Sequence, residues 1–161
     1  MSTHQRILAT VDELLKGPAS TWKKSLSEVC KHLQKSIPHF NWVGFYFANH
    51  ATQTLHLKAF AGLPTDHTEI PFGKGICGQV ALSNQNFQVP DVQQQDNYIA
   101  CDLHVKSELV VPLFVEGQNV GQIDIDSNLL DPFDESDERL LEAVNKKVAA
   151  YIPNKDRKSV V

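Results

Sequence analysis

Two of the three cysteines lie in segments where a thiol could do chemistry. Cys77 lies in GKGICG, where glycines on both sides let the backbone bend and leave the sulfur approachable. If a helix begins there, its N-terminal N–H groups favour the thiolate. Cys101 lies in NYIACDLH, a polar loop just before a predicted strand. Neither cysteine belongs to a clear apolar stripe, so both are candidate redox thiols, with a buried and inert thiol as the alternative for either one.

Three carboxylates form a second candidate group. Asp124 and Asp126, two residues apart in GQIDIDS, share one face of a strand, and Ile123 and Ile125 occupy the other. Glu108 opens the neighbouring strand. Carboxylates gathered in this way suit a pocket for an ammonium group, or a proton donor with a raised pKa. The alternative is a strand face that simply meets solvent.

Two aromatic residues and a set of metal-ligating residue types complete the candidates. Trp42 and Tyr46, four apart in NWVGFYF, share a strand face and are either core aromatics or the walls of a pocket for a small apolar group. The possible metal ligands are Cys77, Cys101, His67 and His104. They show none of the close spacings of structural zinc sites, so we predict no bound metal.

Composition limits the classes of protein that need to be considered. The chain has 161 residues, the size of one domain, and a formal net charge of −4, which argues against a nucleic-acid or membrane-surface partner. No apolar run reaches the length of a membrane span, and the start, MSTHQRILATVDELL, has no signal-peptide pattern. We therefore expect a cytoplasmic protein. There, three cysteines do not form a disulfide framework, and Cys30, on the apolar stripe of a predicted helix, is a core thiol.

Alternating periodicities predict the elements that must position these residues. In chain order we expect helices over 5–16 and 21–36, then strands over 41–47 and 54–60, then a loop over 61–78 with a short helix beginning near Gly75. A short strand and a long polar loop follow within 86–107, and strands over 107–115 and 119–127 are joined by a tight turn. The last helix is capped by Asp134, with Asp137 at its third position. Strands paired as hairpins, with helices at both ends of the chain, predict an α+β domain over 1–152 and a polar tail over 153–161. Its antiparallel sheet should carry helices on one face and the loops of the ligand site on the other.

The chain resembles the GAF-domain free methionine-(R)-sulfoxide reductases. The matching segments are NWVGFYF, IPFGKGICG, VPDV, YIACD, SELVVPL, IDIDS and FDESDERLLE, and the similarity runs from about residue 5 to 152. Generic GAF domains share the hairpins and the acidic final helix but rarely this combination of motifs. The resemblance implies a homodimeric reductase that converts free L-methionine (R)-sulfoxide to L-methionine, with no cofactor and with thioredoxin or a similar external dithiol as reductant.

The resemblance also implies roles for particular residues. Cys101 corresponds to the nucleophile and Cys77 to its partner thiol, although the reverse order stays open. The substrate's ammonium group and sulfoxide oxygen would be bound by the carboxylates of Glu108, Asp124 and Asp126. Its S-methyl group would lie against the aromatic rings of Trp42 and Tyr46, and its carboxylate would be bound by backbone amides near Ile99 and Ala100. An acid with a raised pKa, supplied by Glu108 or Asp126, would protonate the sulfoxide oxygen. Attack by the thiolate would give methionine and a sulfenic acid, which a second thiol converts to a disulfide.

The sequence departs from the family pattern at two places. Many members carry a further cysteine before the GKGICG segment, often assigned as the resolving thiol, where this chain reads GLPTDHTEIP with His67 near the expected place. A family serine after IACD is replaced by Val105. These departures keep open a second hypothesis, a non-catalytic GAF module that binds a small ligand or acts as a sensor.

Overall fold

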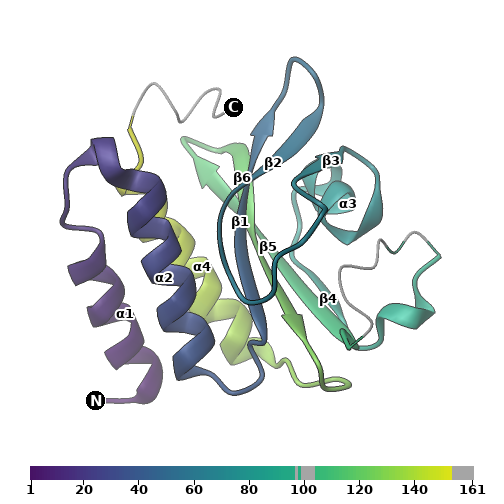
Figure 1. Ribbon diagram of the computed structural model, residues 1–161, viewed down its shortest axis with the longest axis horizontal. Coiled ribbons are helices and arrows are strands. Elements are labelled where there is room, and N and C mark those ends of the chain that lie inside the picture. Colours follow the sequence, from purple (N-terminus) through teal and green to yellow (C-terminus); the bar gives the residue numbers. More distant parts are fainter. Residues whose placement is uncertain (97, 99–103, 154–161) are drawn as a thin grey trace.

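The computed structural model describes residues 1–96, 98 and 104–153, and shows a curled antiparallel sheet covered by helices (Figure 1). The helices are α1 (Thr3–Leu14), α2 (Trp22–Ser36), α3 (Gly75–Ser83) and α4 (Glu135–Tyr151), with short 3-10 turns η1 (Ala19–Thr21) and η2 (Val92–Gln94). The strands are β1 (Trp42–Asn49), β2 (Thr54–Ala61), β3 (Glu69–Pro71), β4 (Phe87–Val89), β5 (Ser107–Val115) and β6 (Gln118–Ser127), in the sheet order β3-β2-β1-β6-β5-β4. The predicted α+β class, the hairpins and the helices at both ends of the chain are confirmed.

Helices α1, α2 and α4 lie together on one face of the sheet, and α3 lies on the opposite face (Figure 1). The larger core cluster fills the space between the sheet and the three helices. Its helix side is made of the stripes that the sequence predicts, among them Leu26, Cys30 and Leu33 of α2 and Leu141 and Val144 of α4. The prediction that Cys30 is a core thiol is confirmed, since it is fully buried and burial raises its pKa far above the usual range.

Helix ends follow from their capping residues. Asp134 caps α4 as predicted, accepting from the Asp137 N–H. The Asp137 side chain in turn accepts from the Asp134 N–H. At the other end of the chain, Ser2 makes the same reciprocal arrangement with Gln5. This cap starts α1 at Thr3, two residues before the predicted boundary.

Two details of the sheet differ from the prediction. The segment expected as a loop contains β3, which pairs with β2 through three residues only and is too short to produce a periodic pattern. The β5–β6 turn is tighter than expected, because Glu116 and Gly117 both take positive φ, 53° and 79°, as a two-residue hairpin turn requires. Strand β6 therefore begins at Gln118. The predicted tail begins at Pro153, and its residues 154–161 lie outside the described part of the chain.

Among the described residues, no helix has both the length and the apolar character that crossing a bilayer requires.

Candidate active site

The sheet face turned away from α1, α2 and α4 carries a second buried cluster in which polar side chains are mixed with apolar ones. On β6, Ile123 and Ile125 face the helices, whereas Asp124 and Asp126 face this second cluster, as the alternation predicts. The two aspartates are each only 2% exposed and Glu108 is 6% exposed. The alternative of a solvent-facing strand is therefore wrong, and three carboxylates lie buried on one sheet face.

Strand register determines which of these groups are neighbours. Glu108 of β5 lies opposite Asp126 of β6, and Asp126 in turn lies opposite Trp42 of β1. Asp124 lies opposite Gly44 on β1. The carboxylates thus lie on the neighbouring strands β5 and β6, and the aromatic strand β1 pairs with the other edge of β6.

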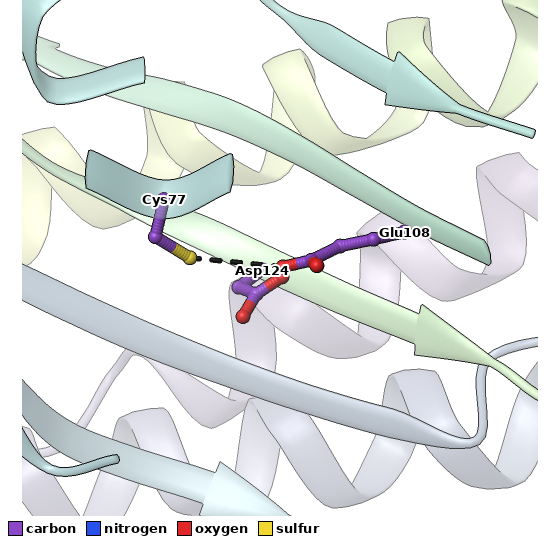
Figure 2. A group of neighbouring side chains, drawn as sticks. All are labelled: Cys77, Glu108 and Asp124. Carbon is purple, nitrogen blue, oxygen red and sulfur yellow. Dashed lines mark hydrogen bonds between the residues drawn. The ribbon is translucent and has the colours of Figure 1, made fainter. Parts of the chain in front are cut away.

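Helix α3 brings the Cys77 thiol onto this group of carboxylates. Cys77 is the third residue of α3 and 5% exposed, and its Sγ donates a hydrogen bond to Glu108 Oε2 at 3.7 Å (Figure 2). The ligating atoms of Cys77, Glu108 and Asp124 all lie within 4.8 Å of one another. The Gln122 side chain holds α3 in this place by donating to the Cys77 carbonyl at 3.1 Å. We call Cys77, Glu108 and Asp124 the buried triad.

Burial and the neighbouring carboxylates raise the pKa of the Cys77 thiol well above its usual value. Burial is the largest cause, followed by the charges of Asp124 and Glu108. Helix α3 does begin near Cys77 as predicted, but the pKa of the thiol is raised and not lowered, so the expectation that the thiolate is favoured is wrong. Cys77 is thus a hydrogen-bond donor in the resting site, not a ready nucleophile.

Asp124 is a carboxyl group suited to hold a proton. Burial raises its pKa above the ordinary 3.8, although hydrogen bonds with Glu108 and Cys77 act against the shift. Its Oδ1 is buried and has no hydrogen-bond partner among the described residues. The sequence reasoning assigned the raised pKa to Glu108 or Asp126 and did not single out Asp124. The group as a whole can donate a proton or accept hydrogen bonds from a cation.

Replacing Asp124 with asparagine is expected to make the free energy of unfolding less dependent on pH. Between pH 3.8 and the raised pKa, the Asp124 carboxyl keeps its proton in the folded protein but has lost it in the unfolded chain. The free energy of unfolding of the wild type therefore falls as pH rises through this range, by at most about 1.4 kcal/mol per pH unit. The variant lacks this loss and should be the more stable protein at neutral pH. Urea denaturation across this pH range measures the difference, with Asp66→Asn, an exposed loop residue, as control. Parallel curves for wild type and Asp124→Asn would contradict it.

Trp42 and Tyr46 share the face that carries the carboxylates, as predicted. The Trp42 ring stacks on Phe60 at 5.9 Å between centroids, and its Nε1 donates to the Leu63 carbonyl at 3.0 Å. The Tyr46 hydroxyl donates to the His67 carbonyl at 2.8 Å. Both rings are thereby held by the loop between β2 and β3, which forms the outer wall of the site.

Gly44 is a positioning residue that the sequence reasoning missed. A Cβ at this position would lie 2.3 Å from Cη2 of Trp42, so the indole occupies the space that a side chain would fill. The glycine between aromatic residues in NWVGFYF is the signal that could have found it, because a strand interior rarely places glycine without a close packing neighbour.

Two hollows adjoin these residues. A pocket of about 270 Å³ is lined by Trp42, Leu63, Val105 and Asp126 among others. A smaller space of about 20 Å³, lined by Tyr46, His67, Lys74 and the buried triad, is large enough for one water molecule. Cys101, Ile99 and Ala100 lie outside the described residues, so their roles stay predictions.

Comparison with known proteins agrees with this architecture. The family model described as GAF domain matches residues 19–152. Free methionine-R-sulfoxide reductase of Escherichia coli is 34% identical over 134 residues, which cover 83% of this chain and 79% of that protein. The Saccharomyces cerevisiae protein of the same name is 35% identical over 150 residues, covering 89% and 82%. The crystal structure of free methionine-R-sulfoxide reductase from Neisseria meningitidis in complex with its substrate has a TM-score of 0.86 and 31% identity, covering 96% of this chain and 89% of that one.

Proposed function

The chain belongs to the GAF-domain family of free methionine-R-sulfoxide reductases, and from this membership we propose that it reduces free L-methionine (R)-sulfoxide to L-methionine. The observation that carries the proposal is the buried triad, which lines a small space with Tyr46, together with the larger pocket that Trp42 and Asp126 line. A thiol, two carboxylates and two aromatic rings are the groups that binding and reducing an amino-acid sulfoxide require.

The charges and shape of the site support binding of a free amino acid. Glu108, Asp124 and Asp126 are acceptors for the substrate's ammonium group, and a cation there relieves the repulsion among buried carboxylates. Trp42 and Tyr46 provide an apolar wall for the S-methyl group. Backbone amides near Ile99 and Ala100 receive the substrate carboxylate. A peptide-bound residue would lack the free ammonium group, which accounts for selectivity toward the free amino acid.

The reaction proceeds in two steps, formation of a sulfenic acid and its conversion to a disulfide. The Cys101 thiolate attacks the sulfoxide sulfur, and with one proton from the carboxylates the oxygen passes to Cys101 as a sulfenic acid while methionine leaves. Asp124, with its raised pKa, is suited to supply that proton directly or through Asp126. The Cys77 thiol then attacks the sulfenic acid, which releases water and forms a disulfide.

Cys77 is suited to the second step. As a buried thiol it does not compete for the substrate in the first step. Glu108 accepts its hydrogen bond and is therefore placed to take the thiol proton when the sulfenic acid is attacked. Resolution by Cys77 replaces the further cysteine that many relatives carry and that this chain lacks.

An external dithiol such as thioredoxin completes the cycle by reducing the disulfide. A cycle of this kind runs only where thiols are kept reduced, so we place the protein in the cytoplasm. We further propose that it is a homodimer, as the resemblance to the family implies.

The function is tested by incubating the purified protein with each epimer of free methionine sulfoxide and measuring released methionine. We expect release from the R epimer with dithiothreitol and with thioredoxin, and none from the S epimer. No release from either epimer by folded protein, together with tight binding of a small amine, would identify a non-catalytic GAF module instead.

Replacing Gly44 with alanine is expected to weaken catalysis by displacing Trp42. The new methyl group needs the space that the indole occupies, so the pocket wall shifts by about the size of a methyl group. A misplacement of this size lowers kcat/KM by roughly tenfold to a hundredfold. Steady-state kinetics with the R epimer measures the change. Gly17→Ala, whose Cβ meets nothing closer than 3.8 Å, is the matched control and should keep wild-type kinetics.

A further inference from the structure

The buried triad brings together three metal-ligating groups that are far apart in the sequence. Cys77 comes from α3, Glu108 from β5 and Asp124 from β6, and their ligating atoms all lie within 4.8 Å of one another (Figure 2). Sequence spacing argued against a metal because no close ligand pair exists. Close spacing is typical of ligands on one local motif and is not required of ligands that a fold assembles from three elements.

The distances between the ligating atoms of the triad suit a tetrahedrally coordinated metal ion. Ligand atoms around a four-coordinate Zn²⁺ with sulfur and oxygen donors lie about 3.4–3.6 Å apart. The Cys77 Sγ and Glu108 Oε2 atoms are 3.7 Å apart, close to this value. Since the ligating atoms lie within 4.8 Å of one another, no pair has to close by more than about 1.4 Å to reach this separation, and side-chain rotation can supply that movement.

Two further observations point to an absent ligand. The Oδ1 atom of Asp124 is buried and has no hydrogen-bond partner among the described residues, in a side chain that is 2% exposed. The space of about 20 Å³ beside it is large enough for one ion or one water molecule. Lys74 in the wall of this space is exposed, so water screens its charge. An unpaired buried carboxylate oxygen beside such a space is costly unless something binds to it.

We propose that Cys77, Glu108 and Asp124 are the protein ligands of a site for a thiophilic divalent cation, and that this cation is Zn²⁺. A thiolate and two carboxylates carry three negative charges, and a divalent cation neutralises two of them in place of protons. Water fills the fourth position. Since the same carboxylates are assigned to the substrate's ammonium group, bound Zn²⁺ should inhibit the reductase competitively. This consequence rests on the proposed function, whereas binding of the ion does not.

The experiment titrates the full-length protein, reduced with a phosphine, with Co²⁺ and then displaces Co²⁺ with Zn²⁺. We expect one Co²⁺ per chain with a thiolate-to-cobalt charge-transfer band, which Zn²⁺ removes. Cys77→Ser should abolish the band. Loss of a residue that only hydrogen-bonds to a metal ligand weakens binding roughly tenfold to a hundredfold, so Asp124→Asn, which alters a ligand itself, should weaken binding at least that much. Cys101→Ser and Cys30→Ala should retain the band. Circular dichroism shows that each variant is folded.

Absence of the band in folded wild type would overturn the proposal, and so would a band that survives Cys77→Ser or disappears in Cys101→Ser. The two proposals fail separately. A protein that reduces the R epimer and binds no Co²⁺ contradicts only the metal site, and a protein that binds Co²⁺ through Cys77 but releases no methionine contradicts only the proposed function.

Discussion

Replacing Cys101 with serine is expected to lower methionine release from the R epimer by at least about a thousandfold, the scale on which loss of a nucleophile acts. A serine hydroxyl is not ionised at neutral pH and cannot become a sulfenic acid. Neither of the other thiols is suited to replace it. Cys30 is fully buried among the helices, and the Cys77 thiol holds its proton because of burial and the adjacent carboxylates. Methionine release measured with dithiothreitol in excess gives the comparison.

Two further cysteine variants make this result specific. Cys30→Ala should keep wild-type activity, because Cys30 packs in the helix-side core away from the carboxylates. Cys77→Ser should stay active with dithiothreitol, which reduces a sulfenic acid directly, but lose turnover with thioredoxin, which acts on the disulfide. If Cys101→Ser kept full activity while Cys77→Ser lost it with both reductants, the nucleophile would be Cys77.

Replacing Glu108 with glutamine should lower kcat/KM for the R epimer by about a hundredfold or more, the range for loss of a proton-transfer group. The side chain is buried, accepts from Cys77 and lies opposite Asp126, so the amide removes charge from the centre of the site. Loss of an ammonium partner raises KM, and loss of proton transfer lowers kcat. Separate determination of kcat and KM distinguishes the two contributions.

Glu69→Gln is the matched control, because Glu69 is an exposed carboxylate on β3, away from the buried sheet face. It should leave both constants unchanged. Equal kinetics for Glu108→Gln and wild type would contradict the role assigned to the buried carboxylates. A fall in both variants would point to a general effect of net charge instead.

The fold could be predicted from the sequence because its signals are local. Alternation in GQIDIDS placed Asp124 and Asp126 on the face opposite Ile123 and Ile125, and the structure confirms it. Their depth could not be predicted, because burial of that face depends on α3 and on the β2–β3 loop, which arrive from other parts of the chain. The same pattern is compatible with a strand face that meets water.

The electrostatics of Cys77 show why local reasoning about a site fails. A helix N-terminus was identified correctly, and by itself it lowers the pKa of a thiol. Burial of the thiol raises its pKa first, followed by the charges of Asp124 and Glu108. The covering elements and the two carboxylates come from other parts of the chain, so their influence appears only once the fold assembles them. The contact of Gly44 with Trp42 was missed for a related reason: it depends on the rotamer of a side chain two residues away.

The reductase proposal depends on the protein's own thiols supplying the electrons, and a single turnover tests this most directly. Fully reduced protein, freed of small thiols, is mixed with excess free methionine (R)-sulfoxide, and released methionine and remaining free thiols are counted. We expect one methionine per chain and the loss of two thiols, and no methionine from Cys101→Ser. No methionine from folded, substrate-bound wild type would contradict the reductase proposal.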